Sequence, residues 1–329
     1  MWDPAPAAKL PTVAAAAAAG SEQMAIEIGL ELSSAVSDAV RQGANAVVRV
    51  DGGRRRASSG TVWDSGGVIV TAAHGLDSGD EVELGLPSGD CAPAEVVGRD
   101  PSTDLAVLRT RASGLATPTW SGLPLAVGQL AVVVTRPGRG PRAALALVAR
   151  LGDAWRTAAG GRIDRYVELD AAVQAGFSGG LVVDLGGRAV GLASAGLVRG
   201  EPLAVPPATL RRVVEAVLAH GGVRRGYLGV ASLPVRVPAA LAQATGQDGA
   251  LLLTAVEEAS PAARAGLIVG DLLLALDGAP LCEMGDLLPA LEEERIGQVV
   301  RVRLARGGAV RELDLVVDVR GARRAGGDR

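Results

Sequence analysis

The sequence predicts a mainly β protein, a β-barrel or sandwich followed by a smaller α+β domain. Segments rich in β-forming residues recur about every ten residues from residue 46 onward, separated by Gly, Pro, Asp and Ser, as in antiparallel β domains. Forty-five glycines supply the tight turns that many short strands need. A length of 329 residues leaves room for a second domain with its own core.

The first elements are a leader and one helix. Residues 1–22 are expected to be unstructured. Apolar residues at helical spacing then predict a helix from about Glu22 to Gly43. The strands expected after it are Ala46–Val50, Val68–Thr71, Glu81–Leu86, Leu105–Leu108, Leu130–Thr135, Tyr166–Leu169, Leu181–Val183 and Val190–Ala193.

The run Pro207–His220 predicts a second amphipathic helix, which Gly221 and Gly222 end. A mixed α+β unit follows after Arg225. Its expected strands are Tyr227–Val230, Leu251–Val256, Leu272–Leu276, Val299–Leu304 and Arg311–Val317, with helices near Pro261–Ala265 and Gly285–Glu294.

Composition argues against several functions. The formal net charge of −3 gives no basis for binding nucleic acid. Cys91 and Cys282 fall in different expected domains, which argues against a disulfide framework. The sequence contains no metal-binding cluster, phosphate loop or dinucleotide fingerprint, so no metal and no cofactor are expected.

The apolar segments are too short for a membrane span, which needs about 20 residues. Val13–Ala19 is weakly apolar and follows Asp3 and a single basic residue, Lys9, which makes it a poor secretory signal. These observations predict a cytoplasmic location, with the cell envelope or secretion as the alternative.

The chain has two histidines, His74 and His220, which limits where imidazole chemistry can occur. His220 ends an amphipathic helix, where an imidazole complements the negative end of the helix dipole, and this favours a structural role. His74 closely follows the apolar segment Val68–Ala72, and a turn directly after a strand holds an imidazole rigidly at the surface. His74 is therefore the candidate general base.

Two further motifs complete a candidate catalytic triad. Asp104 directly precedes the apolar run Leu105–Leu108, where a partly buried carboxylate needs a partner. Ser178 lies among glycines, which let the amides of Gly176 and Ser178 converge on one point as an oxyanion hole requires. Ser178 would be the nucleophile, His74 its base and Asp104 the group that fixes the imidazole tautomer. Each motif alone also fits an ordinary turn.

The motifs around His74, Asp104 and Ser178, taken in this order, resemble the chymotrypsin-fold serine proteases, and most closely the HtrA/DegP family. The similarity covers about residues 45–318. It also includes Val97–Leu108, Glu168–Val173, Leu203–Pro206, Arg224–Val230, Ser260–Asp271 and Ala275–Gly278.

The resemblance implies a chymotrypsin-like double β-barrel followed by a small α+β PDZ domain. We expect a leader and N-terminal helix at 1–44, a trypsin-like serine protease domain at 45–222, a PDZ domain at 223–320 and a loose tail at 321–329. In the PDZ domain, the amides of Tyr227, Leu228, Gly229 and Val230 would bind the C-terminal carboxylate of a peptide that adds to the sheet edge.

The resemblance also implies a serine endopeptidase that cleaves unfolded or misfolded protein. Proteases of this fold place a specificity residue six positions before the serine, here Ala172. Ala172 offers no charge to a basic side chain and Val173 adds an apolar wall, so cleavage after small aliphatic residues is expected. Unfolded proteins, peptides and peptide C-termini are the expected partners, and a homotrimer is an assembly that the family suggests.

The sequence departs from the family pattern beside the nucleophile. Phe177 stands where the family usually has Asn, Leu181 where it has Pro, and Thr135–Gly138 replaces its Gly-Asn-Pro-Phe-Gly turn. A Phe makes none of the hydrogen bonds of an Asn, so packing must hold the loop. The alternative to an active protease is an inactive protease-fold scaffold whose PDZ domain binds protein C-termini. A chaperone-like holdase with incidental cleavage is a third reading. Retention of Gly176 and of all three triad residues favours the enzyme.

Overall fold

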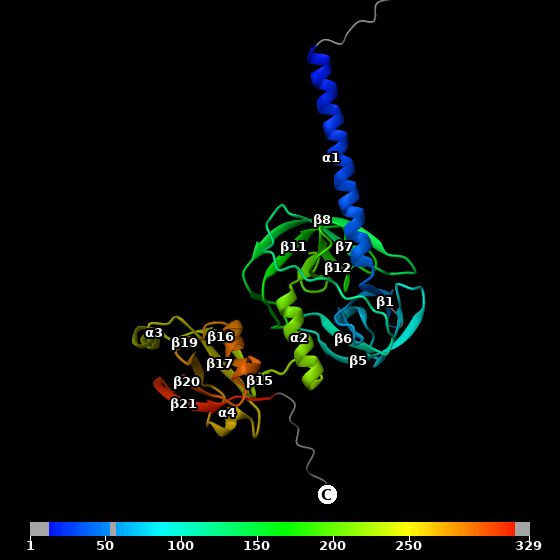
Figure 1. Cartoon of the computed structure of the whole chain (residues 1–329). Helices are drawn as coiled ribbons and strands as arrows, with labels where there is room; N and C mark the ends of the chain where they lie inside the picture. The colour runs from blue at the N-terminus through cyan, green and yellow to red at the C-terminus, as the bar shows by residue number, and fades with distance from the viewer. Residues whose placement is uncertain (1–12, 53–56, 320–329) are drawn as a thin grey trace, which may run out of the picture. The chain divides into compact units, whose positions relative to one another are not determined.

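The structure is a computed structural model that describes residues 13–52 and 57–319 (Figure 1). The chain divides into two compact units, residues 1–214 and 215–329. The first twelve residues of the expected leader and the tail expected at 321–329 lie outside the described residues.

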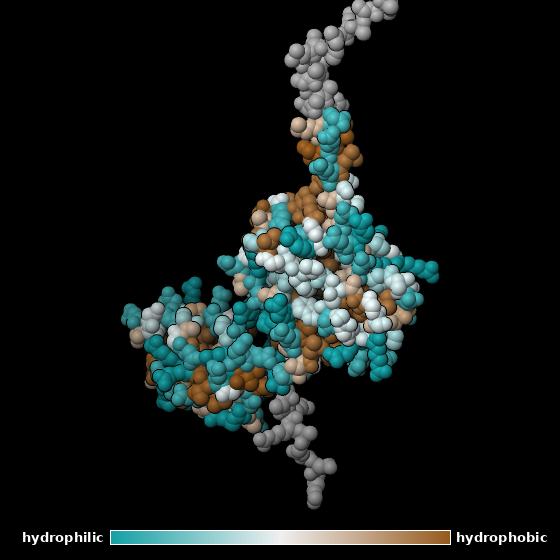
Figure 2. All heavy atoms as spheres, in the orientation of Figure 1, coloured by the Kyte–Doolittle hydropathy of each residue, from teal (hydrophilic) through white to brown (hydrophobic). Residues whose placement is uncertain are grey.

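Helix α1 (Val13–Ala44) is longer than the sequence predicted. It begins well before the expected start near Glu22, because the alanines at 14–19 have the highest helix propensity of any residue. Its last turns bury Ala39 and Ala44 against the outer face of β7 and β12. On its earlier turns Ile28 and Leu30 remain exposed, and Figure 2 shows this helix as a partly apolar surface.

The first barrel closes six antiparallel strands in the order β1-β2-β3-β6-β5-β4. The strands are β1 (Val47–Asp51), β2 (Ser58–Val62), β3 (Val68–Ala72), β4 (Glu81–Gly85), β5 (Cys91–Asp100) and β6 (Leu105–Thr110). Val48, Ile69 and Leu108 are fully buried in its core. β3 and β6 pair so that Ala72 lies opposite Leu105, which brings the end of one strand beside the start of the other.

The second barrel closes six more strands in the order β11-β14-β13-β12-β7-β8. They are β7 (Leu130–Thr135), β8 (Arg142–Gly152), β11 (Tyr166–Asp170), β12 (Leu181–Asp184), β13 (Ala189–Ser194) and β14 (Leu203–Val205). The short pair β9 (Trp155–Arg156) and β10 (Arg162–Ile163) precedes β11, and α2 (Pro207–His220) follows β14. Val133, Val182 and Phe177 are buried in this core.

The second unit is built on one sheet with the order β16-β17-β18-β20-β21, in which β16 is an edge strand. Its strands are β15 (Gly226–Tyr227), β16 (Val230–Arg236), β17 (Gly249–Val256), β18 (Leu272–Leu276), β19 (Ala279–Pro280), β20 (Val299–Arg306), β21 (Ala309–Val316) and β22 (Asp318–Val319). Helices α3 (Ala239–Thr245) and α4 (Pro261–Arg264) lie between them. Two closed barrels followed by this α+β unit confirm the predicted fold class.

The helix predicted at Gly285–Glu294 forms two 3₁₀ segments instead, Met284–Leu291 and Glu293–Arg295. Pro289 lies inside the first of them. A proline has no N–H to donate and its ring clashes with the preceding turn, so an α-helix is disfavoured through this position.

Candidate active site

His74 is held by the turn that follows β3. All five residues of β3 are buried, and the chain then enters a single 3₁₀ turn, Ala73–Gly75. The N–H of Ala73 donates to the carbonyl of Asp104 at 3.0 Å, which ties this turn to the start of β6. The His74 side chain is 43% exposed, so the buried strand fixes a ring that substrate can still reach.

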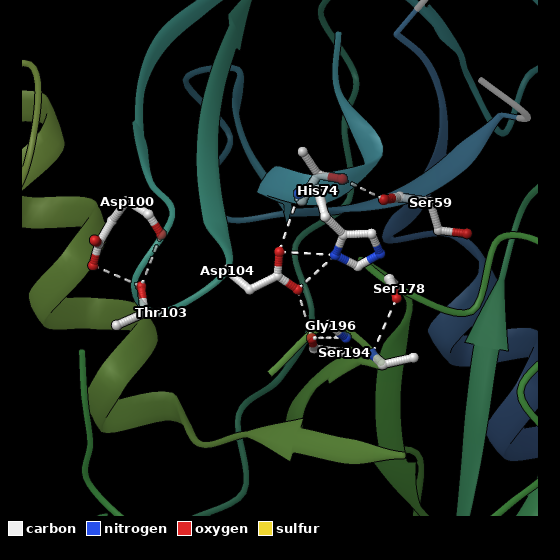
Figure 3. Close-up of polar contacts among 10 residues, drawn as sticks. Ser59, His74, Asp100, Thr103, Asp104, Ser178, Ser194 and Gly196 are labelled. Carbon is white, nitrogen blue, oxygen red and sulfur yellow. Dashed lines mark hydrogen bonds and ion pairs between the residues drawn. The ribbon is translucent and has the colours of Figure 1, made fainter. Parts of the chain in front are cut away.

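Asp104 is the carboxylate partner of His74. The residue is 5% exposed and adopts a positive φ of 56° directly before β6. Its Oδ1 accepts the backbone N–H of His74 at 3.0 Å, and both carboxylate oxygens lie 2.8 Å from His74 Nδ1 (Figure 3). A proton on Nδ1 therefore has a carboxylate to donate to, which leaves Nε2 of the neutral ring as the basic nitrogen.

Asp100 organises the turn that carries Asp104. Its Oδ1 accepts the hydroxyl of Ser102 at 2.5 Å, and its Oδ2 accepts the hydroxyl of Thr103 at 2.8 Å (Figure 3). The carbonyl of Ser102 in turn accepts the hydroxyl of Thr157, which directly follows β9, at 2.6 Å. Asp100 thus stabilises the turn through its side-chain oxygens, as aspartates commonly do.

Ser194, at the end of β13, is a site residue that the sequence did not reveal. Its hydroxyl is fully buried, donates to Asp104 Oδ2 at 2.6 Å and accepts the N–H of Gly196 at 3.1 Å. Asp104 therefore receives a hydrogen bond from the second barrel as well as those from His74. A serine between alanines at a strand end carries no signal of this role, because the contact depends on how the two barrels meet.

Ser178 lies where the second barrel meets the first, and two glycines separate it from β12. Its N-terminal neighbour Phe177 is buried in the core of the second barrel, so packing holds the loop at this point. Ser178 Oγ accepts the N–H of Ala195 at 3.1 Å. Figure 3 shows the His74 ring lying between the Asp104 carboxylate and Ser178. The three candidate triad residues are thus brought to one place by two barrels.

The loop before Ser178 presents two backbone amides. The N–H of Phe177 donates to the carbonyl of Gln174 at 3.0 Å, and Gly176 has φ of 78°. This is the geometry of a type II turn, which requires a residue tolerant of positive φ at its third position. Within the described part of the chain, the amides of Gly176 and Ser178 have no recorded protein acceptor. Both N–H groups are thus available to a developing oxyanion.

Ala172 and Val173 lie on the exposed segment that leads into this turn, and Val173 is 51% exposed. A separate cavity of about 420 Å³ opens beside His74 and Asp104. Its lining is mixed: Pro101, Ala158, Gly196 and Leu197 are small or apolar, whereas Arg99, Ser102 and Thr157 are polar.

In the second unit, the predicted carboxylate loop Tyr227–Val230 runs into the edge strand β16. Gly229 has φ of 79°, and a Cβ there would lie 2.1 Å from Cβ of Ser260. Glycine is therefore required here on two grounds. Leu228 is buried, and the hydroxyl of Tyr227 donates to Glu257. The free side of β16 offers main-chain groups to an incoming strand.

Two further kinds of site are absent from the described residues. Among the described residues, no group of three or more His, Cys, Asp or Glu side chains could hold a metal ion. No helix in the described ranges 13–52 and 57–319 is long and apolar enough to cross a membrane.

Each unit is similar to a known domain family. Residues 58–192 match the family of the trypsin-like peptidase domain, and residues 235–317 match the PDZ domain. The chain is 27% identical over 271 residues to serine endoprotease DegS of Haemophilus influenzae, which covers 79% of this chain and 76% of that protein. It is 31% identical to a probable periplasmic serine endoprotease DegP-like of Bartonella henselae, covering 79% of this chain and 52% of the relative.

Solved structures show the same fold. A serine endoprotease from Yersinia pestis superposes with a TM-score of 0.69 at 25% identity, covering 86% of this chain and 97% of that one. The HtrA-type protease AlgW with a decapeptide gives a TM-score of 0.69 at 24% identity, covering 87% and 98%. The chain spans about half the length of the curated DegP-like relatives that it matches.

The cytoplasmic location predicted from the sequence is wrong. Relatives that match 79% of this chain are named periplasmic endoproteases, which points to the cell envelope. The prediction depended on the weak apolarity of Val13–Ala19, and these residues form the start of α1. An alanine-rich helix carries little information about the compartment in which a protein works.

Proposed function

We propose that this chain, which joins a trypsin-like peptidase domain to a PDZ domain as HtrA-type proteases do, is a serine endopeptidase that cleaves unfolded or misfolded protein. The observation that carries the proposal is the meeting of His74, Asp104 and Ser178 at the contact between two barrels. The proposal also draws on the names of relatives, which are serine endoproteases.

The chemistry follows from the protonation state of His74. Asp104 binds the Nδ1 proton, so Nε2 takes the proton of the Ser178 hydroxyl as Oγ attacks the carbonyl carbon of the substrate. The resulting imidazolium is stabilised by the Asp104 carboxylate and then protonates the leaving amine. Water deprotonated by the same Nε2 hydrolyses the acyl-enzyme and restores Ser178.

The oxyanion formed in each tetrahedral intermediate would accept hydrogen bonds from the amides of Gly176 and Ser178. These donors are fixed before substrate binds, so they stabilise developing charge without reorganising. Phe177 stands where the family usually has a polar residue. Its side chain packs into the core of the second barrel and leaves the amides of Gly176 and Ser178 unaffected.

Substrate preference is proposed from the neighbouring side chains. Ala172 and Val173 carry no charge, so they suit a substrate with a small aliphatic residue before the scissile bond. An unfolded segment can reach an exposed His74 and lie along the site as an extended strand. The PDZ domain would bind the C-terminus of a protein or peptide at Tyr227–Val230, with β16 pairing to it. We place this activity in the cell envelope, following the names of the relatives.

Casein digestion by the wild type and by Ser178→Ala tests the proposal. Loss of the nucleophile is expected to lower turnover by about 10⁶-fold while leaving the fold intact, since only one hydroxyl is removed. Ser113→Ala, an exposed serine of the first unit, serves as the control and should cleave casein at the wild-type rate. Cleavage by Ser178→Ala within tenfold of the wild type would remove Ser178 from the mechanism.

A further inference from the structure

Ser59, on β2 of the first barrel, contacts the loop of the second barrel that carries Ser178. Its backbone N–H donates to the carbonyl of Ser178 at 3.3 Å, and its hydroxyl donates to the carbonyl of Gly176 at 2.7 Å. These are the two residues whose amides form the proposed oxyanion hole. Ser59 is fully buried, so water does not compete for either hydrogen bond.

Every polar group of Ser59 has a partner. Its hydroxyl oxygen accepts the N–H of Arg136 at 2.8 Å, which directs its own proton to Gly176. Its carbonyl accepts the hydroxyl of Thr71 at 2.7 Å. The two backbones also approach closely, because a Cβ on Gly179 would lie 1.9 Å from the Ser59 carbonyl oxygen. Ser59 is therefore held in one rotamer and one position against the loop.

Arg136, the donor to Ser59, is itself firmly placed. Its side chain is buried and donates to the carbonyls of Ala44, Val47 and Arg139 at 2.8, 2.7 and 3.0 Å. Burial lowers the pKa of this guanidinium from its ordinary value, and the three carbonyls compensate part of the lost hydration. Ser59 thus connects a fixed end of β7 to the loop before Ser178.

The contact with Gly176 controls the orientation of a peptide unit. The Gly176–Phe177 unit is bonded at both ends, through its carbonyl to Ser59 and through its N–H to the carbonyl of Gln174. Fixing this unit limits rotation of the preceding one, Ala175–Gly176, which carries the donor N–H. Were that unit to turn over, the Ala175 carbonyl would face the oxyanion and repel it.

We infer that Ser59 is a positioning residue for the oxyanion hole, holding the amide of Gly176 in its donating orientation. The inference rests on the proposed function. Phe177 anchors the loop by packing alone and contributes no side-chain hydrogen bond. The polar restraint on this side of the nucleophile comes instead from a serine on the other barrel.

Ser59→Ala and Ser58→Ala form a matched pair for the test. Ser58 is the adjacent buried serine of β2, and its hydroxyl has no hydrogen-bond partner within the described residues.

With a fluorogenic peptide cleaved by the wild type, Ser59→Ala should lower kcat about 10- to 100-fold, less than the 10²- to 10³-fold cost of removing an oxyanion donor outright. KM should stay within twofold, because the contact acts on the transition state. The acid limb of the pH profile should not move, since no hydrogen bond joins the Ser59 side chain to His74. Ser58→Ala should keep kcat within twofold of the wild type.

Ser59→Cys covers the case in which the alanine variant unfolds. A thiol occupies similar space but is a weak donor, so its kcat should fall between those of the wild type and Ser59→Ala, with an unchanged circular dichroism spectrum. A wild type that cleaves nothing would overturn the proposed function itself. A wild type that cleaves, with a folded Ser59→Ala or Ser59→Cys whose kcat matches that of Ser58→Ala, would overturn the role of Ser59.

Discussion

Ser194→Ala removes the hydroxyl that donates a hydrogen bond to Asp104, the carboxylate that orients His74. In the wild type Asp104 Oδ2 accepts both Ser194 Oγ at 2.6 Å and His74 Nδ1 at 2.8 Å. Hydrogen bonds to charged groups contribute about 1.5–3 kcal/mol. If this contribution is felt in the transition state, where the imidazolium and Asp104 carry opposite charges, 1.36 kcal/mol per factor of ten predicts a fall in kcat of about 10- to 100-fold.

The assay is steady-state hydrolysis of a peptide substrate, with a thermal unfolding curve of each protein beside it. Thr209→Ala is the control. Thr209 is equally buried in the first unit and donates to the Asp164 carboxylate at 2.8 Å. Thr209→Ala therefore removes the same kind of hydrogen bond, but at a position away from His74. We expect both variants to unfold at lower temperature and only Ser194→Ala to lose kcat. Equal kcat in the two variants would show that Ser194 serves only the stability of the barrel.

Three further predictions concern specificity, the PDZ domain and acid stability. Mapping of casein cuts by mass spectrometry should find Val, Ala, Ile or Leu before the scissile bond, and a majority of Lys or Arg would contradict the assignment of Ala172. Isothermal titration should show a free-acid apolar peptide binding at Tyr227–Val230 with roughly micromolar affinity, about −8 kcal/mol, while its amidated form does not bind; equal binding would exclude a carboxylate site. Burial alone would raise the pKa of Asp271, but hydrogen bonds from Arg306 and the Ile268 amide hold it below the ordinary 3.8. A lowered folded-state pKa stabilises the protein above about pH 3.8, and this stabilisation is lost as the pH falls through the lower value. Asp271→Asn should therefore lower the unfolding temperature at pH 7, and this deficit should shrink as the pH falls below 3.8; a deficit that stays constant with falling pH would contradict the linkage.

The sequence singled out the three candidate triad residues because each lies in a recognisable local pattern. His74 follows a mostly apolar strand, Asp104 directly precedes the apolar run Leu105–Leu108, and Ser178 is embedded in glycines. The pairing of β3 with β6 then brings the first two together. The alternation of apolar and turn residues predicted a β-barrel or sandwich, since it reports local structure directly, and the family resemblance was needed to expect two barrels.

Ser194 and Ser59 could not be found in this way. Each is one serine among small residues on a strand, and its importance arises from a contact with a segment far away in the chain. Such contacts depend on how two barrels meet, which no local pattern encodes. The α-helix expected near Gly285 does not form for a local reason, since Pro289 lacks the N–H that an α-helix needs at this position.

The most direct test of the account is the reaction of the purified protein with a fluorophosphonate probe, followed by peptide mapping. A serine attacks this phosphorus only when a base takes its proton, so labelling reports activation of the nucleophile without any assumption about substrate. The account predicts one adduct per chain, on Ser178, formed at a rate that falls by orders of magnitude in His74→Ala. Absence of labelling in a folded wild type, or an adduct on another serine, would contradict it.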